Sequence, residues 1–207
     1  MLALDRLLAE IRACRLCRDA PRHGAALPHE PRPVLRASST ARLCIAGQAP
    51  GTRVHASGIP FDDPSGERLR DWMGVSREEF YDESRVAIVP MGFCFPGLDA
   101  KGSDLPPRRE CAPQWRSRVF DALPRIRLLL TVGLYAQGYH LGSQRRENLT
   151  QTVRAWREIE LAGTPFDVIP LPHPSWRNTA WMKRNPWFEA ELVPELRARI
   201  RALLGRD

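Results

Sequence analysis

Two kinds of hydrophobic pattern alternate along this chain: short continuous apolar runs, and apolar residues at helical spacing. Four apolar runs are short and nearly uninterrupted, which is typical of strands buried on both faces of a sheet. These runs span residues 42–46, 86–91, 126–132 and 166–171. Apolar residues at helical spacing, or capping residues such as Asp63-Pro64, predict helices around and between the strands. The predicted helices span residues 3–13, 63–73, 110–123, 133–140 and 189–204, and residues 154–161 suit either a helix or an edge strand.

Strands that alternate with helices predict an α/β fold with a parallel sheet covered on both faces. The working loops of such sheets lie at the carboxyl ends of the strands. Three unusual segments follow predicted strands: GQAPG at 47–51, the loop around Cys94, and PHPSWRN at 172–178. We therefore expect these segments to meet at one edge of the sheet.

The length of 207 residues suits one domain spanning residues 1–207. Apolar runs are all shorter than the roughly 18–20 residues that cross a bilayer. The N-terminal segment contains Asp5 and Glu10 within its apolar stretch, so it predicts an amphipathic helix instead of a signal peptide. We expect a cytoplasmic, monomeric protein without membrane association.

The formal net charge is +7, with a sequence pI near 9.7. Such a balance favours a polyanionic partner such as nucleic acid. Nearly all of the basic residues are arginine, however, and a GC-rich genome gives the same excess without selection for binding. Charge by itself therefore does not decide the partner.

The five cysteines suggest a metal centre more than a disulfide framework, because a reducing compartment disfavours disulfides. Cys44 lies inside an apolar run and is expected in the core. Cys14 and Cys17 form a C-x-x-C pair, while Cys94 and Cys111 flank sixteen residues. Four thiolates hold either a tetrahedral zinc or a [4Fe–4S] cluster. Spacing leaves zinc, a cluster and four unrelated cysteines as open alternatives.

The order of motifs along the chain resembles that of the family 4 uracil-DNA glycosylases. The motifs are C-x-x-C at 14–17, GQAPG at 47–51, GIPF at 58–61, Cys94, ECAP at 110–113 and HPS at 173–175. The resemblance covers roughly residues 7–178. It implies a three-layer α/β/α sandwich around a four-stranded parallel sheet, and it favours a structural [4Fe–4S] cluster over zinc. It also implies DNA as the partner, either single-stranded or damaged.

The same resemblance assigns roles at the sheet edge. It makes His173 the catalytic residue that stabilises negative charge on the departing base. Gln48 stands where the family commonly has glutamate; it can orient water or bond the base but cannot act as a general base. Gly47 and Ala49 belong to the turn that approaches the base, and Ala49 stands where some related families have a water-activating aspartate. Phe61 matches the aromatic residue that stacks on the flipped base.

A segment after the HPS motif interleaves aromatic and basic residues, which suits contact with bases and phosphates. The candidate DNA-binding residues are Ser175, Trp176, Arg177, Lys183 and Arg184, and the segment also contains Trp181 and Trp187. The alternative is a loop anchored by its tryptophans, with solvated arginines.

One position departs from the family pattern. Uracil-specific members carry a base-reading asparagine four residues before the third cluster cysteine, and Pro90 stands there in this chain. No asparagine occurs between residues 54 and 147, and proline offers neither a side-chain donor nor an N–H. Pro90 is therefore expected at the base-binding site without reading the base by hydrogen bonds. The alternatives are a glycosylase for uracil or another damaged base, a noncatalytic nucleic-acid-binding member, and a zinc-stabilised protein with unrelated chemistry.

Overall fold

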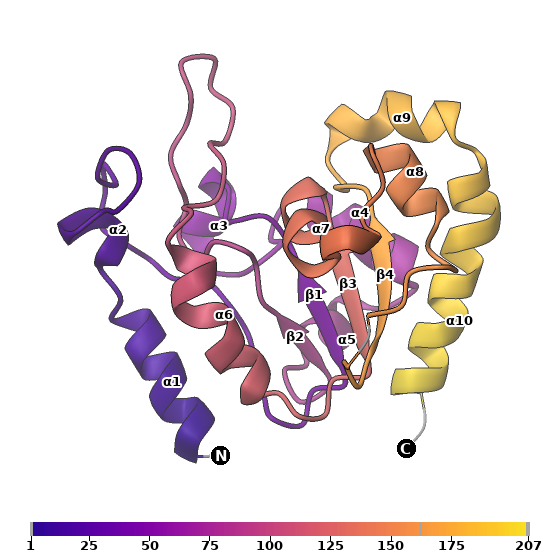
Figure 1. Cartoon of the computed structure of the whole chain (residues 1–207), viewed down its shortest axis with the longest axis horizontal. Coiled ribbons are helices and arrows are strands. Elements are labelled where there is room, and N and C mark those ends of the chain that lie inside the picture. The colour runs from indigo at the N-terminus through magenta and orange to yellow at the C-terminus, as the bar shows by residue number, and fades with distance from the viewer. Residues whose placement is uncertain (1, 162, 206–207) are drawn as a thin grey trace.

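The computed structural model describes residues 2–161 and 163–205 (Figure 1). Four parallel strands form one sheet, in the order β2-β1-β3-β4. The strands are β1 (Leu43–Ala46), β2 (Val86–Ile88), β3 (Leu128–Val132) and β4 (Asp167–Leu171). The predicted α/β class and its parallel sheet are confirmed.

Each strand places alternate residues in two different cores. In β1, Cys44 and Ala46 belong to one hydrophobic cluster, whereas Leu43 and Ile45 belong to the other. All four side chains are buried. Both faces of the sheet are covered, which explains why the strands read as unbroken apolar runs in the sequence.

The two cores separate the main helices into two layers. Three helices contribute to the core that contains Cys44: α1 (Leu2–Arg12), α6 (Cys111–Asp121) and α7 (Leu134–His140). Three others contribute to the core that contains Ile45: α4 (Pro64–Met73), α5 (Arg77–Tyr81) and α10 (Val193–Leu204). The result is the expected three-layer arrangement.

Shorter elements connect these layers and were largely missed by the hydrophobic pattern. They are α2 (Leu16–Asp19), α3 (Thr52–Ser57), η1 (Gly142–Gln144), α8 (Leu149–Arg154), η2 (Trp176–Asn178), α9 (Thr179–Arg184) and η3 (Phe188–Leu192). The start of α5 carries a signal that sequence reading could have used, because Ser76 and Glu79 form a reciprocal capping box. The Asn148 side chain caps α8 by accepting the Gln151 N–H, without the reciprocal bond.

Two predicted boundaries are wrong because of prolines. Strand β2 ends at Ile88 instead of residue 91, since Pro90 has no N–H for the outer edge of the ladder. The last helix was expected to be regular from residue 189. Residues 188–192 instead form a π-helical turn, and Pro194 lies at the start of α10, where it cannot donate to the preceding turn.

The proline-rich segment at 96–109 contains ordered structure. Residues 97–105, called the hairpin below, fold back on themselves with Leu98 paired antiparallel to Asp104. The hairpin projects beyond α3 and α6, at the end of the molecule where the strands finish (Figure 1). Within residues 2–161 and 163–205, no helix combines the length and apolar character required to span a bilayer.

Because β3 is buried on both faces, replacing a leucine in it should lower the free energy of unfolding much more than replacing an exposed leucine. Leu129 is 0% exposed, so Leu129→Ala should lower the free energy of unfolding by about 2–5 kcal/mol through lost burial and a residual cavity. Leu134 is 48% exposed, so Leu134→Ala should change it by less than about 0.5 kcal/mol. Urea denaturation of both variants measures the difference, and equal losses would contradict the assignment of Leu129 to the core.

Candidate active site and cysteine pocket

Beyond the carboxyl ends of the strands lies a cavity of about 440 Å³, called the sheet-edge pocket below. Segments far apart in the sequence meet there. The predicted site residues that line it are Gly47, Gln48, Ala49, Phe61, Pro90, His173, Ser175, Trp176 and Arg177. Of the three segments expected to meet at this edge, GQAPG and PHPSWRN do so. Cys94 itself lines a different pocket, and only Gly102 and Asp104 of the loop that follows it reach this one.

His173 presents a defined hydrogen-bonding state at this pocket. Its Nδ1 accepts the backbone N–H of Ser175 at 3.2 Å. Burial lowers the pKa of His173, although the carboxylate of Asp63 opposes this shift. A neutral ring whose Nδ1 accepts a hydrogen bond carries its proton on Nε2. His173 can therefore donate one hydrogen bond from Nε2.

The loop that carries His173 is tied down on both sides. The Asn178 side-chain amide donates to the His173 carbonyl at 2.7 Å. From α4, Arg68 Nη1 donates to the carbonyls of Pro174 at 3.3 Å and Ser175 at 3.1 Å. These bonds hold the backbone around the histidine without using its ring. Sequence reading missed both supporting side chains. The partners of Arg68 lie on a loop more than a hundred residues away, whereas Asn178 lies in the same loop as His173.

Phe61 occupies an unusual backbone conformation at the pocket wall. Its φ of 56° lies in the left-handed region, which costs a non-glycine residue roughly 1–2 kcal/mol. Gly47 leaves room for the ring, since a Cβ there would lie 3.1 Å from Phe61 Cζ. Gly66 is equally necessary, because a Cβ there would lie 1.8 Å from the Phe61 carbonyl oxygen. The ring is thus fixed against the turn that follows β1.

Pro90 forms an apolar part of the pocket wall, and its backbone is fixed by hydrogen bonds from Arg116. The buried Arg116 donates from Nη1 to the carbonyls of Val89 at 3.1 Å and Pro90 at 3.0 Å. Its Nε donates to His140 Nε2 at 2.7 Å. Burial lowers the pKa of Arg116 to about 10, and burial together with the arginine charge lowers the pKa of His140 to about 2. The pair is therefore a cation with a neutral acceptor.

Two carboxylates in the pocket were not among the predicted site residues. Asp63 and Asp104 both line it, from the start of α4 and from the hairpin. The Asp63 side chain accepts the Gly66 N–H at 2.9 Å as the cap of α4. Burial raises the pKa of Asp104, and Asp63 adds to this effect. The capping pattern identified Asp63 as a helix start, which concealed its second location at the pocket.

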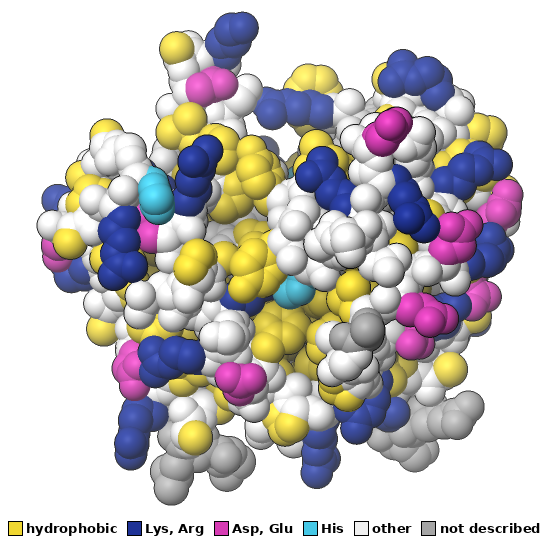
Figure 2. All heavy atoms as spheres, viewed as in Figure 1, with side chains coloured by type: hydrophobic (Ala, Val, Ile, Leu, Met, Phe, Trp, Pro, Cys, Tyr) yellow, Lys and Arg dark blue, Asp and Glu magenta, His cyan; other side chains and the backbone are white. Residues whose placement is uncertain are grey.

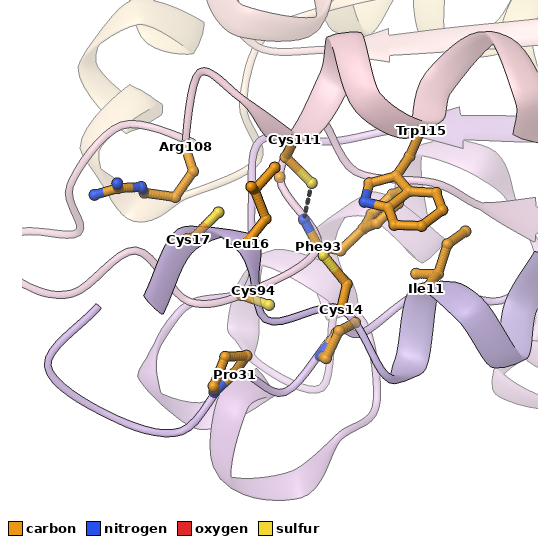
Figure 3. A pocket seen from close by; sticks show the side chains of 12 residues that line it. Ile11, Cys14, Leu16, Cys17, Pro31, Phe93, Cys94, Arg108, Cys111 and Trp115 are labelled. Carbon is orange, nitrogen blue, oxygen red and sulfur yellow. Dashed lines mark hydrogen bonds between the residues drawn. The ribbon is translucent and has the colours of Figure 1, made fainter. Parts of the chain in front are cut away.

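A second, largely apolar pocket contains the four cysteines predicted as metal ligands. Cys14, Cys17, Cys94 and Cys111 all line it, and their sulfur atoms face a shared space (Figure 3). The Phe93 N–H donates to Cys111 Sγ at 3.3 Å. The four residues come from the link between α1 and α2, from α2, from the segment after β2 and from the start of α6. Cys44 lies apart from them, fully buried in the core as expected.

The thiols of this cysteine pocket are held in apolar surroundings. Burial raises the pKa of Cys17, of Cys94 (to about 12) and of Cys111. Neighbouring thiols add to each of these three shifts, which agrees with their closeness. Thiols in such surroundings are protonated at neutral pH, and a metal would displace the protons. Among the residues that the structure describes, no three histidine, cysteine or carboxylate side chains converge tightly enough to share a single ion.

The segment after the HPS motif divides into exposed and buried parts. Trp176 is 76% exposed at the rim of the sheet-edge pocket. Trp181 is buried and its indole N–H donates to Thr150 Oγ1 at 2.8 Å, so its expected place among the DNA-facing aromatics is wrong. Trp187 packs against the same core. Lys183 and Arg184 are exposed in the last turn of α9, outside the pocket lining.

Comparison with protein families identifies the chain. Residues 36–197 match the family model of the Uracil DNA glycosylase superfamily. The matched region includes all four strands and every predicted residue of the sheet-edge pocket. It begins after Cys14 and Cys17.

The neutral His140 predicts a pH dependence of stability. Below its ordinary pKa of 6.5, the unfolded chain binds a proton here that the folded chain does not. The free energy of unfolding should therefore fall between pH 6 and pH 4, with up to about 1.4 kcal/mol per pH unit from this group. His140→Gln retains an acceptor for Arg116 and should reduce that slope. Urea denaturation at several pH values measures it, and an unchanged slope would contradict a neutral His140.

Proposed function

The chain belongs to the Uracil DNA glycosylase superfamily, and on that premise we propose that it excises a damaged base from DNA. The reaction would hydrolyse the N-glycosidic bond of uracil or another damaged base after the nucleotide leaves the stack. Residues 1–207 would act as one domain. The observation that carries this proposal is the single pocket that joins Gln48, Phe61 and His173 at the carboxyl edge of the sheet.

His173 would stabilise the leaving base. As the bond to the sugar breaks, negative charge develops on the base oxygen. A neutral imidazole that donates from Nε2 can stabilise this charge without first losing a proton to solvent. The Ser175 N–H at Nδ1 supports that tautomer, and the lowered pKa supports the neutral state.

The opposite charge would develop on the sugar, which becomes cationic as the base departs. The carboxylates of Asp63 and Asp104 face the same pocket and can stabilise positive charge there. Gln48 can hold the attacking water through its amide, although it cannot remove a proton. A water that attacks such a reactive cation needs little help from a base, so a pocket with Ala49 in place of an aspartate can still support hydrolysis.

The pocket walls favour stacking over hydrogen-bonded reading at one edge of the base. The Phe61 ring offers an aromatic face, and Pro90 offers an apolar surface. The Pro90 carbonyl is bonded to Arg116, and proline has no side-chain amide of the kind that an asparagine would supply. We therefore propose a specificity broader than uracil alone, with hypoxanthine and xanthine as further candidate bases.

DNA contact would centre on the loop after β4. Ser175, Trp176 and Arg177 line the pocket rim, where an extruded nucleotide would leave the duplex. Lys183 and Arg184, exposed on α9, would add phosphate contacts farther along the strand.

The cysteine pocket would hold a [4Fe–4S] cluster, as in the family 4 glycosylases. Four thiols around one apolar pocket are the donor set that such a cluster uses. A cluster distributes its thiolate ligands over several iron atoms, so it needs thiols around a cavity and not around one point. When bound, it would supply cross-links between α1, α2 and α6 and would take no part in hydrolysis. Zinc is the alternative ligand for the same thiols.

Pro90 is the one observation that favours a second function, binding of DNA without base excision. Without the base-reading amide, the same pocket could bind an extruded base and leave its bond intact. The chain would then be a noncatalytic DNA-binding member of the superfamily. The two functions differ in one product, because only the enzyme leaves an abasic site.

The first test is base excision by the purified protein. Oligonucleotides that contain uracil, hypoxanthine or xanthine, in single and double strands, are incubated and then cleaved with alkali. We expect strand cleavage with at least one base. His173→Ala should lower the rate by about 10²–10³-fold, the typical loss of one charge-stabilising donor.

Matched variants keep this test specific. His23→Ala changes an exposed histidine outside the pocket and should leave the rate unchanged. His173→Gln retains a side-chain donor of similar size and guards against misfolding of the alanine variant. Full activity of both His173 variants would remove the residue from the mechanism. Intact DNA binding without product from any base would favour the noncatalytic function.

The cysteine pocket predicts a bound metal centre that depends on Cys14. Anaerobically purified protein should be brown and contain iron and acid-labile sulfide. Cys14→Ser should lower both contents and the free energy of unfolding, because a ligand is lost. Cys44→Ala should keep the iron and sulfide, since Cys44 lies in the core away from the pocket. A colourless protein that contains zinc would contradict the cluster.

A further inference from the structure

The hairpin at residues 97–105 brings one carboxylate to the sheet-edge pocket. Asp104 lines this pocket together with Gln48 and His173, although it lies far from both in the sequence. A Cβ at Gly51 would lie 3.1 Å from Asp104 Oδ2, so the carboxylate packs directly against the turn that follows β1. Gly51 lies two residues after Ala49, the position where some related families have a water-activating aspartate. A separate segment therefore places a carboxylate beside that turn.

The position of Asp104 is fixed by the bonds of its neighbours. Asp104 pairs antiparallel with Leu98 across the hairpin. On the pocket side, Arg177 Nη2 donates to Ser103 Oγ at 3.1 Å, which joins the hairpin to the loop that carries His173. Asp104 is thus held between two loops of the pocket before any ligand binds, which lowers the cost of ordering a reactive geometry.

The Asp104 carboxylate is available to accept a proton. Among the residues that the structure describes, no side chain forms a hydrogen bond or ion pair with it. The Asp63 carboxylate, by contrast, accepts the Gly66 N–H at 2.9 Å as the cap of α4. Water reaches Asp104 from the pocket mouth, yet partial burial raises its pKa, with Asp63 adding to the rise and Arg177 opposing it. A raised pKa makes a carboxylate a stronger base.

The charge of Asp104 does not help the protein to bind DNA. Basic side chains are more numerous than acidic ones over the end of the molecule from which the hairpin projects (Figure 2). Phosphates would be attracted to this end, and a carboxylate at the pocket mouth repels them. Any benefit of Asp104 must therefore come from the reaction and not from affinity for DNA.

Hydrolysis of the N-glycosidic bond requires a group that accepts a proton. A water that bonds to C1′ of the sugar must lose a proton, while the electron pair of the broken C1′–N bond leaves with the base. Gln48 can orient this water, but its amide is not a base. His173 Nδ1 already accepts the Ser175 N–H, and its Nε2 proton would be directed at the departing base. A separate acceptor is needed.

We propose that Asp104 is the general base of the reaction and accepts the proton of the water that attacks C1′. The inference rests on the proposed function, because the pocket must receive an extruded nucleotide. The bond from the water oxygen to C1′ forms as the C1′–N bond breaks, the base departs as an anion stabilised by His173, and the proton goes to Asp104. Solvent then takes this proton from Asp104 and supplies one to the base. Asp63 remains a helix cap whose charge acts from a distance.

The test compares carboxylate variants in single-turnover excision, with an oligonucleotide that carries a base excised by wild type. Asp104→Asn removes the proton acceptor at nearly constant volume. It should lower the rate by about 10²-fold, near the lower end for a general base, because the sugar cation is itself reactive. Asp104→Glu keeps a carboxylate and should retain more of the rate. Asp63→Asn preserves a helix cap and should lower the rate much less. Asp5→Asn changes an exposed carboxylate of α1 and should leave the rate unchanged.

Two further measurements separate a base from a fixed negative charge. The wild-type rate should fall on the acid side as Asp104 binds a proton, at a higher pH than the ordinary aspartate pKa of 3.8 would give. Asp104→Asn should lack this fall. Added formate should partly restore the rate of Asp104→Ala, because it can accept the proton in place of the missing side chain. Chloride at the same concentration is an anion without basic character and should not restore it.

Different results would overturn the general base and the proposed function. An Asp104→Asn variant as fast as wild type, or equal rescue of Asp104→Ala by formate and chloride, would overturn the general base alone. Oligonucleotide affinity shows that the variants are folded, and loss of the Asp104 charge should leave it unchanged or tighter. A wild-type protein that excises no base would overturn the proposed enzymatic function, and the general base with it.

Discussion

One buried cation joins the two parts of the candidate site. Arg116 lies on α6, which begins at Cys111, and it bonds to the carbonyls of Val89 and Pro90 and to His140 on α7. A guanidinium removed from water is strongly unfavourable unless its donors are paired. Nε and Nη1 of Arg116 are paired by these bonds, whereas Nη2 is buried without a partner among the described residues. The end of β2, α6 and α7 must therefore pack together. Pro90 lines the sheet-edge pocket and Cys111 lines the cysteine pocket, so both depend on the same buried bonds.

The strands were predictable because burial on both faces requires an almost continuous run of apolar residues. Runs such as residues 128–132 contain no polar interruption except Thr131, which is itself buried. The start of α4 was predictable, since Asp63-Pro64 supplies both a cap and a favoured first position. Short helices such as α3 and α9 carry too few turns for a period to be recognised. The π-helical turn before α10 depends on a single proline within an otherwise regular pattern.

The location of the pocket was predictable from topology, because loops after parallel strands share one edge of a sheet. The side chains that support it were not. Arg68 acts on a loop more than a hundred residues away, and no local pattern marks such a partner. Asp104 reaches the pocket only because the hairpin folds back. Trp181 was misassigned because a run of aromatic and basic residues does not reveal which rings face the core.

Cys94 and Cys111 flank the hairpin at residues 97–105 in the chain. Cys94 and Cys111 bracket the sixteen residues that contain it, and the bond from the Phe93 N–H to Cys111 Sγ already holds the two ends together. Oxidation of either sulfur would introduce a polar, bulkier group into an apolar pocket and break that closure. Residues 95–110 would then be less constrained, and the tip of the hairpin would move most. Oxidation of these cysteines would thus change the position of the hairpin, which itself contains no sulfur atom.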